Sequence, residues 1–150
     1  MTKQFRITEE KQLLRQFGSL CFKRKKQGIR ILLITSRDTG RWVIPKGWPI
    51  KKLGDDGTAL EEAWEEAGVI GQVTNKNVGS YIYTKLMDSG LTADCRVEVY
   101  PIEVERLKEN FPEKSQRLRR WFSVSGAASK VDEPELRDII NSFGKKLEQG

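Results

Sequence analysis

The sequence predicts an α/β sandwich, a fold class in which a mixed β-sheet lies between helices, and three observations support it. The chain has 150 residues, the size of one ordinary domain, so we expect a single domain over residues 1–150. Apolar and polar residues alternate along several segments, as they do in half-buried strands. The expected elements follow the order strands, helix, strands, helix, which is typical of a sheet covered by helices.

The first half of the chain is expected to contain a run of strands followed by one helix. The strand-like segments are residues 17–24, 29–37 and 41–45. The turn KKQG joins the first two as a hairpin, and Pro45 closes the third. A loop over residues 46–56 leads into a helix from about Asp56 to Ala67. This helix ends at Gly68, because glycine suits the position that follows a helix.

The second half is expected to contain further strands and two helices. The strand-like segments are residues 69–87 (one long strand or two short ones), 95–107 and 118–124. Loops are expected over residues 88–94 and 108–117, and a short helix over SGAASKV. The last segment, residues 132–149, is predicted to be an amphipathic helix. Its apolar residues recur at helical spacing: Leu136, Ile139, Ile140, Phe143 and Leu147.

The charge and composition of the chain exclude several chemistries. The net charge of +6 favours anionic partners such as polyphosphates, nucleic acid or an acidic membrane surface. The chain contains no histidine, which excludes histidine-based triads, histidine-ligated zinc and imidazole acid–base catalysis. Any catalysis must therefore use carboxylates, lysine, tyrosine, cysteine or a metal ion.

The sequence also favours a cytoplasmic protein. No apolar run approaches the ~20 residues that a membrane span needs, and the polar N-terminus lacks the apolar core of a signal peptide. We expect residues 1–14 to form a flexible arm or a short helix. Cys21 and Cys95 lie in apolar, strand-like contexts, so we expect buried free thiols in a reducing compartment.

Four glutamates crowd the first predicted helix, and three of them share one face. At about 100° per residue, Glu62, Glu65 and Glu66 fall within an arc of roughly 100°, opposite the apolar residues. Such a cluster suits a hard divalent cation, and without histidine it favours Mg²⁺ or Mn²⁺ over zinc. The alternative is an ordinary solvated helix face, and the cluster alone does not decide between the two.

The spacing around this helix resembles the signature of the Nudix hydrolase family. That signature has a glycine, five residues, a glutamate, seven residues and then Arg-Glu-apolar-x-Glu-Glu-x-Gly-apolar. The matching residues here are Gly47, Glu62, Ala63, Glu65, Glu66, Gly68 and Val69. The resemblance implies the Nudix-type α/β/α sandwich with a central mixed β-sheet, and structural roles in the motif for Gly47 and Gly68.

The resemblance extends beyond the signature to the diphosphoinositol polyphosphate phosphohydrolase branch, over residues 17–124. The matching pieces are Leu20-Cys21-Phe22, Thr35-Ser36-Arg37, Arg41-Trp42, and Arg117 with Arg120-Trp121-Phe122. The loop between Met87 and Cys95 and the last helix are not obviously shared.

Two positions depart from the signature. Leu53 stands at the family's first glutamate, and Glu61 stands at its arginine. We infer that the family's pair helps to hold the loop against the helix, so a substitute is expected in this chain. An ion pair from Lys51 or Lys52 to Glu61 is the candidate. We expect the two departures to affect catalytic efficiency more than metal binding, because the three-carboxylate cluster is complete.

The resemblance implies a hydrolase in which water attacks a phosphoanhydride with the help of Mg²⁺ or Mn²⁺. It assigns metal binding to Glu62, Glu66 and the main-chain carbonyl of Lys46, and the general base to Glu65. The sequence leaves the division between base and ligand open among these three glutamates. The candidates for a further acidic metal ligand are Glu98, Glu103 and Glu113.

The resemblance also assigns phosphate contacts. They fall on Ser36, Arg37, Arg117 and, more loosely, Arg15, and arginine's planar fork suits phosphate. The Lys46 ammonium would lie beside the metal site. Trp48 is expected either to stack on a base or to cover the helix.

These inferences predict a cytoplasmic, Mg²⁺- or Mn²⁺-dependent pyrophosphohydrolase. Its partner would be an anionic polyphosphate small molecule, either a diphosphoinositol polyphosphate or a dinucleoside polyphosphate. The alternative is a catalytically weak Nudix-fold module that binds a nucleotide or an RNA 5′ end. No membrane partner is expected, and no aromatic-interleaved basic strand or helix-turn-helix pattern favours a general nucleic-acid-binding protein. The sequence leaves the oligomeric state open.

Overall fold

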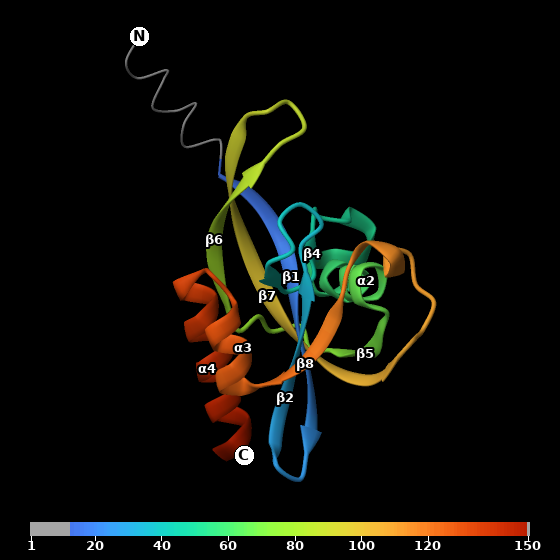
Figure 1. Cartoon of the computed structure of the whole chain (residues 1–150), viewed down its shortest axis with the longest axis vertical. Coiled ribbons are helices and arrows are strands. Elements are labelled where there is room, and N and C mark those ends of the chain that lie inside the picture. The colour runs from blue at the N-terminus through green and yellow to red at the C-terminus, as the bar shows by residue number, and fades with distance from the viewer. Residues whose placement is uncertain (1–12, 150) are drawn as a thin grey trace.

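The structure is a computed structural model that describes residues 13–149, and within them an eight-stranded mixed sheet forms the middle of the molecule (Figure 1). The strands are β1 (Leu14–Lys25), β2 (Gly28–Thr35), β3 (Trp42–Val43), β4 (Lys46–Gly47), β5 (Val69–Val73), β6 (Gly79–Leu86), β7 (Thr92–Leu107) and β8 (Arg119–Ser123). The main path runs β3-β2-β1-β7-β5, while β4 pairs with β1, β6 with β7 and β8 with β2. β1 and β7 run parallel, and the other pairs are antiparallel.

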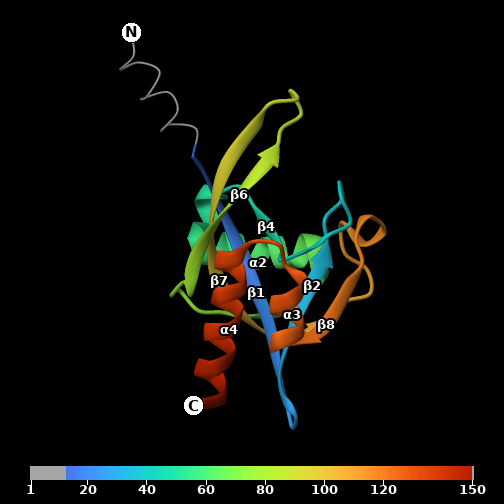
Figure 2. The same ribbon diagram turned by 60° about the vertical axis from the view of Figure 1, so that its left-hand side comes forward.

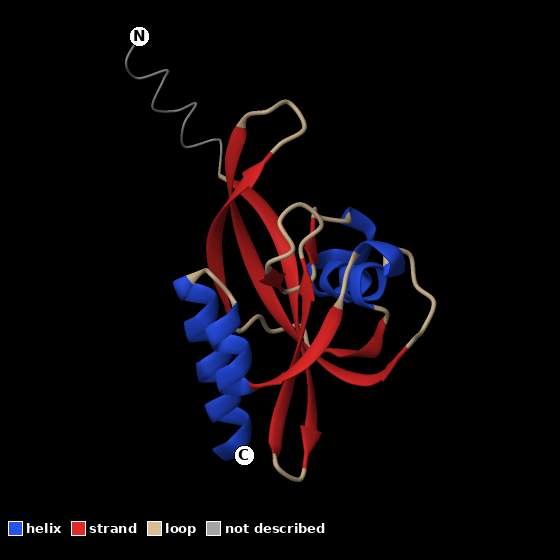
Figure 3. Ribbon diagram, viewed as in Figure 1, coloured by secondary structure: helices blue, strands red, loops and turns tan. Residues whose placement is uncertain are grey.

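Helices cover both faces of this sheet. α2 (Gly54–Ala67) lies on one face, and α3 (Val124–Lys130) and α4 (Pro134–Gln149) lie together on the other, as Figures 2 and 3 show. Short 3₁₀ turns, η1 (Lys51–Leu53) and η2 (Lys114–Gln116), occupy two of the loops. The predicted α/β/α sandwich with a central mixed sheet is therefore confirmed.

The apolar pattern of β2 shows why both layers are needed. Ile31 and Leu33 pack into the core beneath α3 and α4. Leu32 and Ile34 point the other way and pack beneath α2. Because successive side chains of a strand alternate between faces, a strand buried on both sides becomes a nearly continuous apolar run.

The long strand β7 exchanges partners at Pro101. β6 pairs with β7 as far as Val99, and β5 pairs with it from Ile102 onward. Proline has no backbone N–H and normally disrupts a ladder in the middle of a sheet. Here Pro101 lies between the two partners, so neither antiparallel ladder needs the missing donor.

The segment before α2 is more ordered than the sequence predicts. β4 pairs with Phe17 and Gly18 of β1, and η1 leads directly into α2, which begins at Gly54 rather than near Asp56. Gly68 ends α2 with φ 69°, the left-handed conformation that glycine adopts easily, as predicted.

Further expectations concern the two cysteines, membrane-spanning helices and the N-terminal arm. Cys21 and Cys95 are buried free cysteines, as predicted. Across residues 13–149, no helix combines the length and the apolar character that crossing a membrane would require. The predicted arm over residues 1–14 lies outside the described residues except for its last two positions, of which Leu14 already belongs to β1.

Truncation of Leu136 should measure how strongly α4 is anchored to the sheet. Leu136 is fully buried in the core beneath α4, so Leu136→Ala should lower the free energy of unfolding by about 2–5 kcal/mol. Urea unfolding provides the measurement. Ser142→Ala, on the exposed face of the same helix, should change it by less than about 0.5 kcal/mol. Equal effects in the two variants would contradict the assigned packing.

Candidate active site

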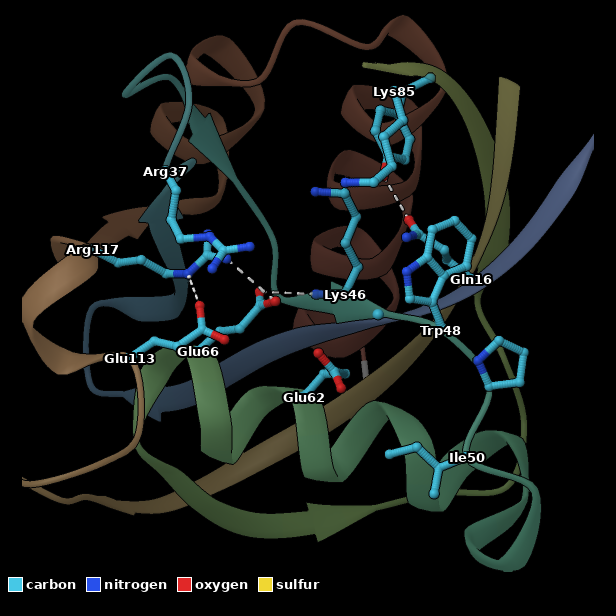
Figure 4. Close-up of a pocket in the computed structure, with 13 residues that line it drawn as sticks. Gln16, Arg37, Lys46, Trp48, Ile50, Glu62, Glu66, Lys85, Glu113 and Arg117 are labelled. Carbon is cyan, nitrogen blue, oxygen red and sulfur yellow. Dashed lines mark hydrogen bonds and ion pairs between the residues drawn. The ribbon is translucent and has the colours of Figure 1, made fainter. Parts of the chain in front are cut away.

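The principal candidate site is a pocket of about 410 Å³ where α2, β4, β6 and the loop before β8 meet (Figure 4). Glu62 and Glu66 rise from α2, and the ends of Arg37, Arg117, Lys46 and Lys85 lie on the other side of the pocket, with Trp48 at its edge. The lining residues are Gln16, Arg37, Lys46, Gly47, Trp48, Pro49, Ile50, Glu62, Glu66, Tyr83, Lys85, Glu113 and Arg117. Acidic and basic side chains from distant parts of the sequence therefore face each other.

The acidic side of the pocket is set by the way α2 packs. Ala59, Ala63 and Ala67 are fully buried against the sheet, and these small side chains let the helix approach it closely. Glu62 and Glu66 are one helical turn apart, so both carboxylates emerge on the same side of the helix. Of the three glutamates predicted to share one face, Glu62 and Glu66 line the pocket together, whereas Glu65 does not.

Gly47 brings β4 against the Glu62 carboxylate. A Cβ atom built on Gly47 would collide with the carboxylate carbon and both carboxylate oxygens of Glu62. Any larger residue would have to displace the carboxylate or the strand. The signature glycine thus leaves room for a buried acid beside the main chain of residues 46 and 47.

Burial and mutual repulsion raise the pKa values of the acid pair. Burial raises the pKa of Glu62 to about 8, and repulsion from Glu66 and Glu65 adds to the effect. The pKa of Glu66 is also raised by burial, although Arg117 and Lys46 partly offset this. Within residues 13–149, Glu62 has no ion-pair partner, so its half-buried carboxylate lacks a cation.

Arg117 forms the centre of the basic side. Its side chain is only 9% exposed and lies 3.4 Å from the Glu66 carboxylate. It donates hydrogen bonds to Glu113 Oε1 at 2.8 Å and to the main-chain oxygen of Thr35 at 3.1 Å. These contacts hold the guanidinium rigidly at the pocket wall.

Lys46 contributes to the site through both its main chain and its side chain. Its backbone N–H donates to Glu66 Oε1 at 3.2 Å, which ties β4 to α2. Its ammonium lies 4.8 Å from the centre of the Tyr83 ring, and burial lowers the pKa of Lys46 to about 8. The ammonium therefore points into the pocket, as the sequence predicts.

A second pocket of about 230 Å³ shares the basic wall with the first. Both are lined by Arg37, Lys46, Tyr83, Lys85 and Arg117. The second pocket adds Ser36 and Arg41, among others. Lys46 and Lys85 form no ion pair with any residue that the structure describes, so the two pockets have cations available for an anionic ligand.

The predicted site residues divide into two groups. Glu62, Glu66, Lys46, Arg37 and Arg117 line the principal pocket, and Ser36 lines the adjoining one. Glu65 does not line either pocket. It is half-buried beside Glu62 on α2.

Arg15 lies away from the pocket, contrary to its assigned phosphate contact. Its guanidinium hydrogen-bonds to Glu98 on the neighbouring strand β7 and lies 3.9 Å from Asp55. Gln16 lines the pocket instead and accepts a 2.6 Å hydrogen bond from the Tyr83 hydroxyl. Since consecutive strand residues face opposite sides of a sheet, Arg15 and Gln16 cannot both point into it.

The structure also selects among the acids that the sequence could not rank. Glu113 lines the pocket, whereas Glu98 pairs with Arg15 and Glu103 pairs with Arg24. Lys85 lines both pockets and was missed by the sequence analysis. The sequence places Lys85 on a strand of alternating residues, but it does not say which face of that strand lines the pocket.

The expected ion pair from Lys51 or Lys52 to Glu61 is wrong. No side chain among residues 13–149 forms an ion pair with Glu61. Both lysines lie exposed on η1, where water solvates their ammonium groups. The link between this loop and α2 must therefore have another chemical basis.

A metal ion at this site would need more than side-chain carboxylates. Within residues 13–149, no group of three or more His, Cys, Asp or Glu side chains is arranged to hold one. Two carboxylates with a main-chain carbonyl nevertheless suit Mg²⁺, which commonly takes one or two carboxylates together with water and substrate phosphates. The half-buried Glu62 carboxylate beside Gly47, with no cationic partner within residues 13–149, is the feature that fits a divalent ion.

Comparison with known proteins identifies similar sequences. No protein-family model matches the chain. Nudix hydrolase 21, chloroplastic, from Arabidopsis thaliana is 30% identical over 131 residues, which cover 84% of this chain and 64% of that protein. Diphosphoinositol polyphosphate phosphohydrolase 3-alpha from Homo sapiens is 29% identical over 110 residues, covering 72% of this chain and 63% of that protein. The chain thus spans somewhat less than two thirds of the length of these relatives.

Solved structures agree with the sequence relatives on the fold. The Ap4A hydrolase of C. elegans superposes with a TM-score of 0.64 at 16% identity, over 90% of this chain and 98% of the other. At this identity the similarity concerns the fold alone.

The crowding of Glu62 should be visible in the stability of the metal-free protein. Glu62→Gln removes a half-buried carboxyl group whose ionisation is opposed by burial and by Glu66, so it should raise the unfolding midpoint by ~2–4 °C, the shift that ~1 kcal/mol produces at this chain length. Adding Mg²⁺ should stabilise the native protein but have little effect on the variant. Thermal unfolding followed by circular dichroism measures both effects.

Glu109→Gln provides the matched control, because Glu109 is exposed and forms no ion pair within the described residues. This control should leave the midpoint and the Mg²⁺ response unchanged. A Glu62→Gln midpoint at or below that of the native protein would contradict the assigned repulsion.

Proposed function

Since its sequence and its fold both match those of Nudix hydrolases, we propose that the chain is a Mg²⁺- or Mn²⁺-dependent pyrophosphohydrolase acting on a polyphosphorylated small molecule. One observation carries this proposal. An acid pair suited to a divalent ion and a cluster of cations suited to phosphates share one pocket. This is the combination that phosphoanhydride hydrolysis requires, because the substrate's negative charge repels an anionic nucleophile.

The acid pair would hold the ion. Glu62 and Glu66 would supply carboxylate oxygens, and the main-chain carbonyl of Lys46 would supply a third oxygen from β4. A divalent ion bound there neutralises phosphate oxygens and makes a nearby water more acidic. Gly47 lets the main chain of β4 lie close to Glu62. The carboxylate and carbonyl ligands would therefore come from α2 and β4, two elements that are already in contact.

Glu65 is the proposed general base, a role that rests on its position in the family signature, because Glu65 lines neither pocket. It lies one position before Glu66 on α2, and burial and repulsion from Glu61 raise the pKa of Glu65, which makes it a better proton acceptor. In the reaction, the water oxygen forms a bond to phosphorus as its proton passes to Glu65. The bridging P–O bond then breaks, and the leaving phosphate departs with the bond's electron pair.

The basic wall would bind the phosphates that are not attacked. Arg117 is fixed by Glu113 and the main chain of Thr35, so its orientation is set before the substrate arrives. Arg37 donates to Gln116 at 3.1 Å and adds a second guanidinium, while Ser36 offers a hydroxyl in the adjoining pocket. This row of donors favours a substrate with several adjacent phosphates, such as a diphosphoinositol polyphosphate or a dinucleoside polyphosphate.

A second candidate function is a weakly catalytic module that binds a nucleotide or an RNA 5′ end. The observation favouring it is the engagement of Glu66, which already faces Arg117 at 3.4 Å and accepts the Lys46 N–H. A carboxylate held in this way is a poorer metal ligand than a free one. The same assay separates the two functions.

We infer a cytoplasmic location from the chemistry of the thiols. Cys21 and Cys95 are free and buried, which suits a reducing compartment. The chloroplastic relative shows that similar proteins occur elsewhere.

The test is phosphate release with Mg²⁺ or Mn²⁺ across a panel of substrates. The panel contains diadenosine tetra- to hexaphosphate, diphosphoinositol pentakisphosphate, nucleoside triphosphates, ADP-ribose and 5′-triphosphate RNA. Turnover that needs the metal and is fastest on the polyphosphates supports the hydrolase. Binding without turnover throughout the panel supports the binding module instead.

Replacement of Glu65 should affect chemistry more than binding. Glu65→Gln removes the proton acceptor at nearly constant size, so kcat should fall at least ~10²-fold while KM changes little. Steady-state kinetics on the best panel substrate measures this. Glu109→Gln, an exposed acid outside the pocket, is the control and should retain full activity. Full activity of Glu65→Gln would remove Glu65 from the mechanism.

Replacement of Lys85 should reveal which substrates reach the basic wall. Lys85→Ala should raise KM about 10-fold for substrates with four or more phosphates and less for ADP-ribose, because Lys85 lines both pockets and a longer phosphate chain can extend from one into the other. Lys130→Ala, a lysine exposed on α3, is the matched control. Equal losses on all substrates would show that Lys85 does not discriminate among them.

A further inference from the structure

The segment between β4 and α2 forms one edge of the pocket. Gly47, Trp48, Pro49 and Ile50 all line the pocket, yet the segment's strand pairing ends at Gly47. The contacts that hold this segment therefore bear on the position of Trp48 and, through Gly47, on the main chain of Lys46, which β1 and Glu66 also hold. We propose that the hydroxyl of Thr58 holds this segment in the position that the reaction needs, a role that rests on the proposed hydrolase function. We call this contact of Thr58 the lock.

The geometry of Thr58 joins the loop to the helix. Its side chain is fully buried on α2. Oγ1 accepts a hydrogen bond from the backbone N–H of Ile50 at 3.0 Å and donates one to the main-chain oxygen of Gly54 at 2.7 Å. A single hydroxyl thus connects the pocket-lining loop to the first turn of α2.

The segment is held at two points, and Thr58 supplies one of them. At the β4 end, the N–H of Lys46 is bound by Glu66 of α2. At the η1 end, the N–H of Ile50 is bound by Thr58. Trp48 lies between these points and is 42% exposed, so its own packing restrains the loop only in part.

Ionic groups do not provide an alternative link. Leu53 is 40% exposed and has no polar group to offer. Glu61 forms no ion pair with any residue in the described part of the chain. Leu53 and Glu61, the two departures from the signature, therefore form no ionic link between the loop and α2. The hydroxyl of Thr58 provides a link between them instead.

The consequence of losing the hydroxyl follows from hydrogen-bond physics. The Ile50 N–H would lose its acceptor, and a partly buried donor without a partner is costly. The loop would then open more often and move the carbonyl of Lys46 relative to Glu62 and Glu66. Thr58 acts through these groups, so it is a positioning residue and not one that touches the substrate.

Three variants of the full chain test the lock. Thr58→Val keeps the shape and removes the hydroxyl, whereas Thr58→Ser keeps the hydroxyl and removes the methyl group. Thr74→Val, in an exposed turn, controls for loss of a threonine hydroxyl elsewhere. The first measurement is the hydrogen-exchange rate of the Ile50 amide by NMR, without metal or substrate. The second is kcat and KM on the best substrate.

If the lock exists, the Ile50 amide should exchange its hydrogen at least ~10-fold faster in Thr58→Val than in the native protein. The kcat of Thr58→Val should fall about 10-fold, at a similar KM. Thr58→Ser and Thr74→Val should match the native protein in both measurements. An unchanged Ile50 exchange rate in Thr58→Val would overturn the lock, whether or not the protein is a hydrolase. A defect in Thr58→Ser comparable to that in Thr58→Val would assign the effect to packing and would equally overturn it.

Faster exchange with unchanged kcat would overturn the positioning role alone. If the native protein hydrolyses nothing on the panel, the proposed function fails. The exchange measurement would still decide whether Thr58 holds the loop.

Discussion

The close contact between β4 and α2 is the constraint on which the rest of the site depends. It is possible because Gly47 has no side chain where Glu62 needs room, and because alanines on the buried face of α2 let the helix lie near the sheet. The contact brings Lys46 of β4 and the carboxylates of Glu62 and Glu66 on α2 to one pocket. A bulkier residue at any of these small positions would separate the groups that the chemistry needs together.

The second feature of the site is the pairing of opposite charges across a small space. Burial raises the pKa of Glu62 and repulsion from Glu66 adds to the cost, and Arg117 pairs with Glu66 but not with Glu62, so the Glu62 carboxylate is the one that a bound cation would stabilise. On the opposite wall, Lys46 and Lys85 lack ion-pair partners within the described residues, and burial lowers the pKa of Lys46. Both walls therefore gain from a ligand that brings a divalent cation together with phosphate groups, which is the composition of the proposed substrate complex.

Much of the fold and part of the site could be predicted because their signals are local. The apolar run within residues 29–37 and the helical spacing of the last helix identify elements that the structure confirms. The spacing of Glu62 and Glu66 predicts their common face, because four residues make about one helical turn. Contacts between distant segments were harder to predict. The ion pair expected at Glu61 is wrong, Arg15 faces away from the pocket, and Lys85 was missed, since each depends on strand pairing and on which sheet face meets which helix.

The sequence by itself determined the element types, the acid pair on one helical face, the glycines of the signature and the absence of histidine chemistry, because these follow from composition and from spacing along one segment. Only the tertiary structure decided that Glu113 rather than Glu98 or Glu103 joins the pocket, that Arg117 faces Glu66, and that Thr58 holds the loop. The physical reason is that such contacts join residues brought together by the packing of α2 and the ends of β2, β4 and β8. Hydrogen bonds and ion pairs act over a few ångströms, and the sequence pattern of one segment does not specify its neighbours at that distance.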